Sequence, residues 1–262
     1  MLTPSEITKR KRQNPIAMIT AYDACFARIA EAAGIDMILV GDSAANVMLG
    51  YSTTREIHME DMLLLTAAVR RGAPNTHVVA DMPWQSDCDV QTALQNARRF
   101  IEVGANSVKL EGSRLDVVRA LRQESISVVG HLGLLPQTAT NFKQRGQSTE
   151  EAEKIYDDAL ALEDAGIFAL VLEHIPERLG ALISQGLRGI PTIGIGAGQQ
   201  VDGQVLVLHD ALGMHPFPLP PFARKFADLY EQGVAGLRRY IEVTRNSAEK
   251  NSYSALARDT SN

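Results

Sequence analysis

The stretch that decides the fold is Ala169-Leu170-Val171-Leu172-Glu173-His174, an apolar run that leads into a carboxylate. An apolar run of this length is typical of a strand that is covered on both faces, as in a parallel sheet flanked by helices. A carboxylate at the far end of such a strand is badly placed for stability alone. The run therefore predicts a buried parallel strand with a functional group at its end.

The same pattern occurs four more times along the chain. In each case an apolar segment runs into a polar residue: Met37 to Val40 before Asp42 and Ser43, Val78 to Ala80 before Asp81, Val108 to Leu110 before Glu111, and Val128 to Gly130 before His131. In a parallel α/β barrel, the carboxyl ends of the strands form the rim that carries the active site. The five polar strand ends therefore predict a site at one end of such a barrel.

Strand and helix patterns alternate eight times in the 262 residues, and a barrel of this kind takes about 250. We therefore expect an α/β fold, a (β/α)8 TIM barrel with a short N-terminal helix. The barrel domain is assigned to residues 1–245, with a last helix from about Phe222 to Val243, and a polar, flexible tail to residues 246–262. A doubly wound open sheet is the alternative, but no Gly-x-Gly-x-x-Gly follows the first strand, where a dinucleotide fold would carry it.

Composition excludes several classes of partner. A net charge of −5 and a pI near 5.7 give no electrostatic basis for binding nucleic acid or an anionic membrane. No apolar segment is long enough to span a bilayer, and the basic N-terminus lacks the apolar core of a signal peptide. Cys25 and Cys88 form no Cys-x-x-Cys motif, so no disulfide framework is indicated. We expect a cytoplasmic protein.

Three of the four acids at the polar strand ends follow consecutive strands: Asp42, Asp81 and Glu111 come after the second, third and fourth strands. Because these strands are neighbours, their carboxylates converge on one side of the barrel mouth. A carboxylate cluster without cysteine suits Mg²⁺ rather than Zn²⁺, and Mg²⁺ takes some of its acids through water. Alternatively, each acid caps the following helix or pairs with an arginine, but three adjacent acids favour a metal site.

The remaining polar strand ends suit substrate chemistry. Lys109 lies two residues before Glu111, so both face the same side of the strand. A buried ammonium group needs an anionic partner, either a substrate or a structural ion pair with Asp81 or Glu111. His131 can donate a hydrogen bond to a bound anion, and Glu173, away from the metal acids, is placed to act as a general base.

A glycine-rich turn, Gly194-Ile195-Gly196-Ala197-Gly198, follows the seventh strand. Many barrels bind phosphate at this position. Glycines also allow tight packing between a strand and a loop, and the motif alone does not separate the two interpretations.

The chain resembles the ketopantoate hydroxymethyltransferase (3-methyl-2-oxobutanoate hydroxymethyltransferase) family. The matching segments run in order from about Ile16 to Phe226. They are Ile19-Thr20-Ala21-Tyr22-Asp23, Val40-Gly41-Asp42-Ser43, residues 67–74, Val108-Lys109-Leu110-Glu111-Gly112, residues 130–134 with Pro136-Gln137, Leu170-Val171-Leu172-Glu173, residues 193–198, Asp202-Gly203-Gln204 and His209-Asp210.

The resemblance implies a barrel of the phosphoenolpyruvate/pyruvate superfamily type and a homodecamer. It implies hydroxymethyl transfer from 5,10-methylenetetrahydrofolate to 3-methyl-2-oxobutanoate, through a Mg²⁺-bound enolate, giving 2-dehydropantoate in pantothenate biosynthesis. The site residues follow motif by motif. Asp42, Asp81 and Glu111 correspond to metal ligands, direct or through water; Asp42, Ser43, Asp81, Lys109 and His131 to substrate contacts; and Glu173 to the catalytic acid/base.

Two segments depart from the family pattern: residues 44–58 after the second strand, and the shortened loop 138–148 after the fifth. Because both overhang the site, a paralogous Mg²⁺-dependent aldolase or lyase that acts on another 2-oxo acid is the alternative function. A phosphate-binding sugar isomerase and a non-catalytic assembly protein are further rivals. The set of polar strand ends makes a non-catalytic role the weakest interpretation.

Overall fold

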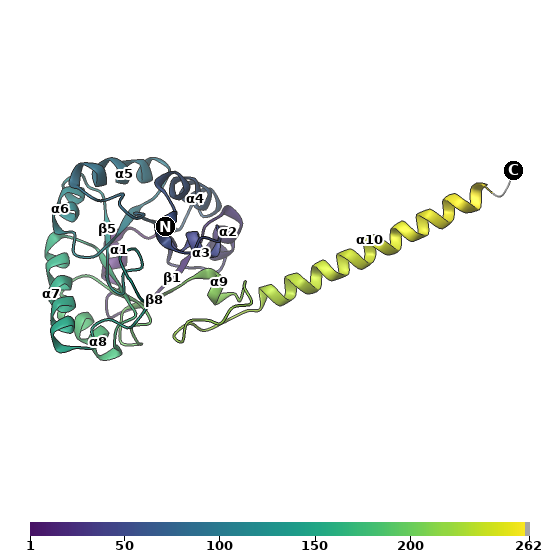
Figure 1. Ribbon diagram of the computed structural model, residues 1–262. Helices are drawn as coiled ribbons and strands as arrows, with labels where there is room; N and C mark the ends of the chain where they lie inside the picture. Colours follow the sequence, from purple (N-terminus) through teal and green to yellow (C-terminus); the bar gives the residue numbers. More distant parts are fainter. Residues whose placement is uncertain (260–262) are drawn as a thin grey trace. The chain divides into compact units, whose positions relative to one another are not determined.

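In the described part of the chain, residues 1–259, eight parallel strands close into a barrel in chain order (Figure 1). The computed structural model describes side chains for residues 1–246. The strands are β1 (Ile16–Thr20), β2 (Met37–Val40), β3 (His77–Asp81), β4 (Ser107–Glu111), β5 (Val128–Gly133), β6 (Ala169–Glu173), β7 (Thr192–Ile195) and β8 (Gly203–Leu206). β8 closes the ring against β1. The predicted barrel is therefore confirmed, and the open sheet is excluded.

Helices connect the strands and surround the barrel (Figure 1). Asp23 begins the first connecting helix, because its Oδ1 accepts hydrogen bonds from the N–H groups of Cys25 (2.7 Å) and Phe26 (2.9 Å). The helices up to β8 are α1 (Pro4–Lys9), α2 (Ala24–Ala32), α3 (Ala44–Val47), the 3₁₀ turn η1 (Thr54–Glu56), α4 (Met59–Gly72), α5 (Val90–Glu102), α6 (Leu115–Gln123), α7 (Thr149–Ala165) and α8 (Glu177–Gly186).

The chain divides into two compact units, Met1–Leu208 and the part from His209 onward. The second unit contains most of α9 (Leu208–Ala211), and α10 (Leu229–Asp259). The predicted bounds of this last helix, about Phe222 to Val243, are wrong at both ends, since it begins at Leu229 and continues to Asp259. The N–H groups of Phe226 and Leu229 donate hydrogen bonds to the carbonyls of Ala211 (2.7 Å) and Leu212 (3.0 Å). The segment before Leu229 is therefore held by the residues that follow α9 and does not form a helix.

The assignment of residues 1–245 to one barrel domain stays a prediction. The expected polar tail, residues 246–262, falls almost entirely outside the described side chains, which end at residue 246.

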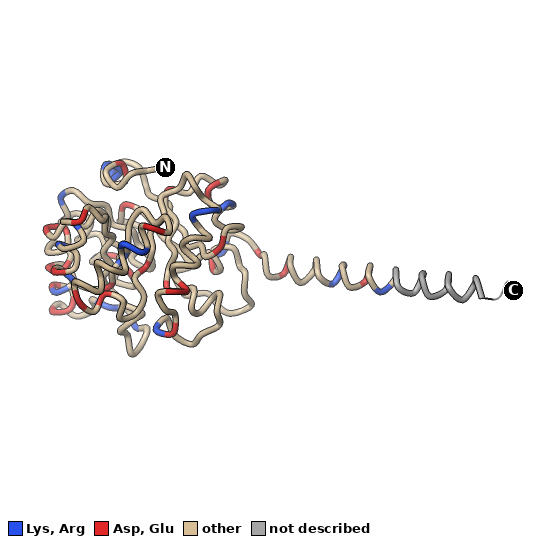
Figure 2. The backbone as a smooth tube through the Cα atoms, turned by 90° about the horizontal axis from the view of Figure 1, so that it is seen from above, with Lys and Arg blue, Asp and Glu red and all other residues tan. Residues whose placement is uncertain are grey.

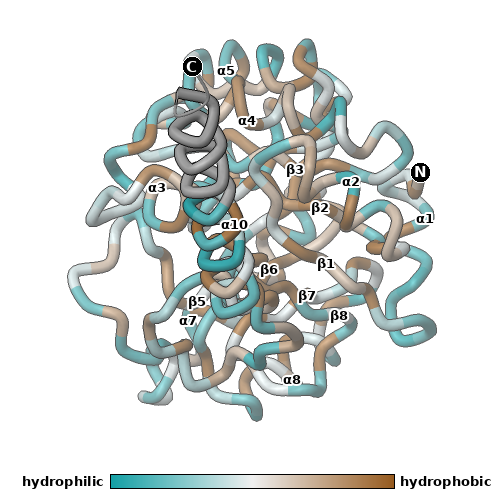
Figure 3. Tube along the Cα trace, turned by 90° about the vertical axis from the view of Figure 1, so that its right-hand side faces the viewer, coloured by the Kyte–Doolittle hydropathy of each residue, from teal (hydrophilic) through white to brown (hydrophobic). Residues whose placement is uncertain are grey.

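Side chains of the strands alternate between the barrel interior and the outer helices. In β2, Met37 and Leu39 belong to an inner apolar cluster, whereas Ile38 and Val40 pack in the cluster beneath the helices. The strands are coloured as apolar along much of their length in Figure 3. Each buried side chain of this size contributes about 1.5–3 kcal/mol. Because both faces are covered, the strands show the continuous apolar runs seen in the sequence.

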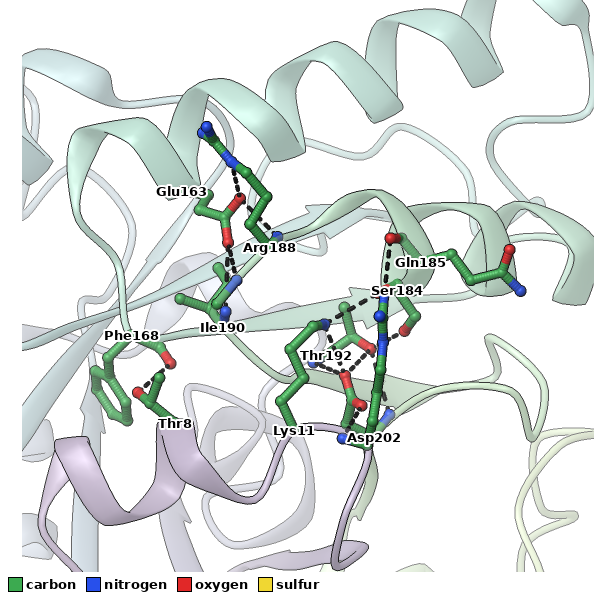
Figure 4. A network of polar contacts seen from close by, with 12 residues as sticks. Thr8, Lys11, Glu163, Phe168, Ser184, Gln185, Arg188, Ile190, Thr192 and Asp202 are labelled. Atoms are coloured by element: carbon green, nitrogen blue, oxygen red, sulfur yellow. Dashed lines mark hydrogen bonds and ion pairs between the residues drawn. The ribbon is translucent and has the colours of Figure 1, made fainter.

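The amino-terminal end of the barrel is closed by α1 and the segment that follows it (Figure 4). Ile7 of α1 is fully buried in the inner cluster. Asp202 accepts hydrogen bonds from Lys11 Nζ (3.3 Å) and the Arg12 N–H (2.9 Å). It also accepts one from the N–H of Thr192 at the start of β7 (2.9 Å). These contacts tie the N-terminal segment to the end of the barrel opposite the predicted site.

Charged residues of both signs are interspersed along the outer helices (Figure 2). Arg98 of α5, for example, pairs with Glu124 at the end of α6 at 2.7 Å. Within the described residues, no helix combines the length and apolarity needed to cross a membrane.

Candidate active site

Inward-facing positions at the carboxyl ends of the strands meet in one pocket of about 320 Å³. The strand register places Asp81 beside Lys109, and Glu111 beside His131. The pocket is lined by every site residue that the sequence predicts: Asp42, Ser43, Asp81, Lys109, Glu111, His131 and Glu173. Its size is at the lower end of the range for small-molecule sites, which suits a small substrate.

Lys109 and Asp81 form a buried ion pair, with 2.6 Å between Nζ and Oδ1. The other oxygen of Asp81 accepts the Asp42 N–H at 3.3 Å. Burial by itself would lower the pKa of Lys109, but the charges of Asp81, Asp42 and Glu111 raise it above its usual value. The ammonium group is therefore charged, and the ion-pair alternative for Lys109 is present in the structure.

Two of the acids, Asp42 and Glu111, have raised pKa values, so their charged forms are disfavoured in the ligand-free pocket. Burial, and then the charge of Asp81, raise the pKa of Asp42 to about 7. Burial also raises the pKa of Glu111 well above its usual value, and Asp42 and Asp81 add to the effect. Lys109 opposes both shifts. The pocket therefore favours any added positive charge.

His131 lies between two carboxylates. Its Nδ1 is 3.6 Å from Glu111 Oε1, and its Nε2 is 3.2 Å from Glu173 Oε2. Neither ring nitrogen makes a well-aligned hydrogen bond within the described residues. Burial, followed by the charge of Lys109, lowers the pKa of His131. A neutral ring has one N–H, which remains available to a ligand.

Ser43 and the glycine-rich turn differ in their relation to the pocket. Ser43 lines the pocket, and its hydroxyl lies 2.8 Å from the Tyr22 hydroxyl. At the turn, a Cβ on Gly198 would lie 2.2 Å from Glu177 Cγ, and the Glu177 carboxylate already accepts the Gln199 N–H at 3.1 Å. A carboxylate in this position favours tight packing over phosphate binding as the role of the turn.

Sequence reasoning assigned no role to Gln137, whose side chain is buried in the loop after β5. Its Nε2 donates to Asp42 Oδ2 (2.9 Å), and its N–H donates to Glu111 Oε2 (3.2 Å). Gln137 is part of the Pro136-Gln137 match to the family, but a neutral side chain in a long loop carries no positional signal comparable to that of a strand end.

The carboxylates fit a hard cation in chemistry and in charge. Among the described residues, four carboxylates and one lysine line the pocket. Glu111 Oε1 is buried without a hydrogen-bond partner, as an oxygen reserved for a ligand would be. No three His, Cys, Asp or Glu side chains of the described part already form a metal cluster. Mg²⁺ does not need one, since it takes one or two carboxylates and keeps several waters.

Comparison with known proteins gives a consistent result. A family model described as ketopantoate hydroxymethyltransferase matches residues 1–248. A 3-methyl-2-oxobutanoate hydroxymethyltransferase of Geobacillus sp. (strain WCH70) is 48% identical over 249 residues, which cover 92% of this chain and 89% of the relative. One from Pseudothermotoga lettingae is 45% identical over 243 residues, 90% of this chain and 91% of the relative.

Solved structures of lower identity share the fold. 2,3-Dimethylmalate lyase, described as a member of the PEP mutase/isocitrate lyase superfamily, has a TM-score of 0.60 at 17% identity, covering 95% of this chain and 89% of its own. Phosphonopyruvate hydrolase in complex with oxalate and Mg²⁺ has a TM-score of 0.63 at 12% identity, covering 94% and 88%. This likeness supports the predicted type of barrel.

Proposed function

Because the chain belongs to the ketopantoate hydroxymethyltransferase family, we propose that it transfers a hydroxymethyl group from 5,10-methylenetetrahydrofolate to 3-methyl-2-oxobutanoate. The product is 2-dehydropantoate, for pantothenate biosynthesis. The observation that carries the proposal is the convergence of four carboxylates, Lys109 and His131 in one pocket at the barrel mouth. That set can bind a 2-oxo acid and remove a proton from it.

Glu173 is the general base in this proposal. Its side chain is 19% exposed, whereas those of Asp81 and Lys109 are at most 4% exposed, so it is the more open to the pocket. It takes the proton from C3 of the 2-oxo acid and leaves an enolate. C3 then bonds to the methylene carbon of the folate as one C–N bond breaks, and water adds the hydroxyl oxygen as the second C–N bond breaks. The two folate nitrogens take up the proton held by Glu173 and one proton of the water, and tetrahydrofolate leaves.

Other groups that line the pocket stabilise the charge that this step creates. Lys109, Ser43 and His131 line the same pocket, and the neutral His131 ring carries one N–H. They are placed to hold the carboxylate and the 2-oxo oxygen of the substrate while negative charge develops.

Asp42, Asp81 and Glu111 would hold Mg²⁺, directly or through water. When bound, Mg²⁺ supplies Lewis-acid chemistry that withdraws charge from the 2-oxo group and acidifies the C3 proton. The partnerless Glu111 oxygen and the raised pKa values of Asp42 and Glu111 support this assignment.

Proton NMR of 3-methyl-2-oxobutanoate in D2O with enzyme and Mg²⁺ tests the proposal. We expect the C3 proton signal to disappear, and 2-dehydropantoate to form once methylenetetrahydrofolate is added. Glu173→Gln should slow the exchange by about 10²–10⁴-fold, since it removes the base. Glu153→Gln, on the exposed face of α7, is the matched control and should exchange as the wild type does.

Three outcomes would change the assignment. Exchange without transfer would keep the enolising site and exclude this one-carbon donor. A clear preference for another 2-oxo acid in an acceptor panel would support the paralogous aldolase or lyase. An active preparation that neither exchanges nor forms product would refute the assigned substrate.

The proposal also includes a cytoplasmic homo-oligomer, a decamer by family resemblance. Several large apolar side chains of α10, namely Leu237, Tyr240 and Ile241, are 65%, 67% and 42% exposed in the single chain, which supports association. Light scattering after size-exclusion chromatography would give the number of subunits.

A further inference from the structure

We propose that Arg55 and Gln137 are positioning residues, which together clamp the loops after β2, β3 and β5 and fix Asp42 and Glu111 for metal binding. This inference rests on the proposed function only in the assumption that Asp42 and Glu111 bind the metal. Neither Arg55 nor Gln137 belongs to the predicted set of site residues, and each step from Arg55 through Gln137 to the two acids is a hydrogen bond.

Arg55 makes the first part of the clamp. It lies in η1, in the segment between β2 and α4, and reaches across the barrel mouth to the loop after β5. Its Nε donates to the Gln137 carbonyl at 2.6 Å, and its Nη2 donates to the Ala139 carbonyl at 3.3 Å. A planar guanidinium can donate hydrogen bonds to two carbonyls at once in this geometry, whereas the ammonium group of a lysine is a compact point charge.

The turn that carries Arg55 is itself braced. The Glu56 carboxylate accepts the N–H groups of Ser52 (3.0 Å) and Thr53 (3.1 Å). The Thr53 hydroxyl accepts the Arg55 N–H at 3.3 Å. The guanidinium is therefore presented by a short, capped turn, even though its side chain is exposed.

A third loop joins through Trp84. The Arg55 guanidinium carbon lies 5.3 Å from the centre of the Trp84 ring, in the loop after β3. A cation over an indole face at this distance is attracted to it by the ring quadrupole. Since Trp84 is the one tryptophan of the sequence, its fluorescence reports on this contact directly.

Gln137 transmits the clamp to the acids. Its carbonyl is held by Arg55, and its side chain is 5% exposed. One Nε2–H bond goes to Asp42 Oδ2 and the other to the Met82 carbonyl, each at 2.9 Å, so the amide orientation is fixed from two sides. The backbone N–H holds Glu111 at 3.2 Å. A shift of this one residue would therefore move both carboxylates.

Groups that orient metal ligands typically change metal affinity or activity by about 10–100-fold when they are removed. The test uses Arg55→Ala, Arg55→Lys and Gln137→Met, with Arg145→Ala as the matched control. Arg145 lies in the same loop and also bonds a backbone carbonyl, that of Asn141 at 3.2 Å, but within the described residues its side chain makes no hydrogen bond or ion pair with Asp42 or Glu111. Circular dichroism checks that each variant is folded.

Three measurements separate a positioning role from a merely structural one. They are Mn²⁺ binding to the substrate-free protein by electron paramagnetic resonance, the Trp84 emission maximum, and kcat and KM for exchange of the C3 proton. For Arg55→Ala we expect the Mn²⁺ Kd to rise about tenfold, kcat to fall about as much, and the emission to shift to longer wavelength as the ring gains water. Arg55→Lys should not restore wild-type values.

Gln137→Met should weaken Mn²⁺ binding without moving the Trp84 emission, because it keeps the carbonyl that Arg55 grips. Wild-type Mn²⁺ affinity in Arg55→Ala or Gln137→Met, or full rescue by Arg55→Lys, would overturn the clamp. A wild type that binds no Mn²⁺ would overturn it too. If the wild type binds Mn²⁺ but exchanges no proton, and Arg55→Ala binds Mn²⁺ weakly, the clamp stands and the proposed substrate fails.

Discussion

Lys109 Nζ lies 2.6 Å from Asp81 Oδ1, and both side chains are at most 4% exposed. A buried ion pair of this kind often contributes little net stability, because both charges lose their hydration. Lys109 also feels the charges of Asp42 and Glu111, so one ammonium group balances three acids. The arrangement is better suited to holding ligands at the barrel mouth than to stabilising the fold.

Removal of the Lys109 ammonium should destabilise the ligand-free protein, because it leaves buried acids without a counter-charge. A bound cation should offset part of this loss of stability. For Lys109→Met we expect the free energy of unfolding in chelator to fall by about 3–5 kcal/mol, because Asp81 is left buried and unpaired. Added Mg²⁺ should recover part of the loss. Urea denaturation measures both effects.

Lys154→Met is the control for this change. Lys154 is 72% exposed in its i,i+4 pair with Asp158, so its loss should cost at most about 0.5 kcal/mol. Equal losses in the two variants would contradict the electrostatic account of Lys109.

Gly133 holds the end of β6 in place. Its φ is +99°, and a Cβ there would lie 2.2 Å from the carbonyl oxygen of Glu173. We expect Gly133→Ala to lower stability by more than the roughly 1–3 kcal/mol of a strained φ alone, and to slow C3 exchange, because Glu173 must move. Gly34→Ala is the control, since Gly34 has a φ of +81° with open space around it. Similar losses in both would show that the clash is relieved without moving β6.

The barrel was predictable because its strands are covered on both faces and so appear as continuous apolar runs. The two-residue alternation of a strand also fixes which side chains enter the barrel, so Lys109 and Glu111 could be placed together from sequence. What sequence left open was the partner of Lys109, which the register of β3 and β4 decides by placing Asp81 beside it.

The clamp lay beyond sequence reasoning for a physical reason. Arg55 and Gln137 are 82 residues apart, and both lie in connections whose conformation is set by tertiary contacts. The expected departures from the family pattern at residues 44–58 and 138–148 fall in the same two connections, but they do not predict which side chains meet there. The start of α10 was missed for the same reason, because hydrogen bonds to Ala211 and Leu212 override local helix preference.

His77 gives a pH dependence that is independent of the active site. It is fully buried, with Nδ1 2.9 Å from the Leu2 carbonyl and Nε2 2.9 Å from the Ser107 hydroxyl. Burial lowers the pKa of His77 to about 4, from an ordinary value near 6.5. Between these values the unfolded chain binds a proton that the folded chain does not. Its contribution to stability is therefore complete above about pH 6.5 and declines by about 3 kcal/mol as the pH falls to about 4.

The measurement for His77 is the pH dependence of the free energy of unfolding, compared with His77→Asn. Asn can still donate to the Leu2 carbonyl but does not titrate, so subtracting the two curves removes the contribution of other groups. Parallel curves through this window would show that the His77 pKa is not lowered.

Asp202 allows stability to be separated from catalysis, because it lies at the opposite end of the barrel from the pocket. Its carboxylate joins Lys11 and the Arg12 N–H to the start of β7. Asp202→Asn removes the charge that pairs with the 7% exposed Lys11 side chain and replaces one acceptor oxygen by a donor. We expect about 3–5 kcal/mol of destabilisation and faster proteolysis near residue 12, with kcat per folded molecule unchanged.

Asp164→Asn, whose side chain is 65% exposed beside Arg188, is the matched control and should alter neither stability nor cleavage measurably. Cleavage is followed by limited proteolysis with mass spectrometry, and kcat by C3 exchange under conditions where the variant is fully folded. A fall in kcat for the folded Asp202→Asn protein would mean that the two ends of the barrel are coupled. The N-terminal segment would then influence the pocket through β7 and β8, rather than only closing the base.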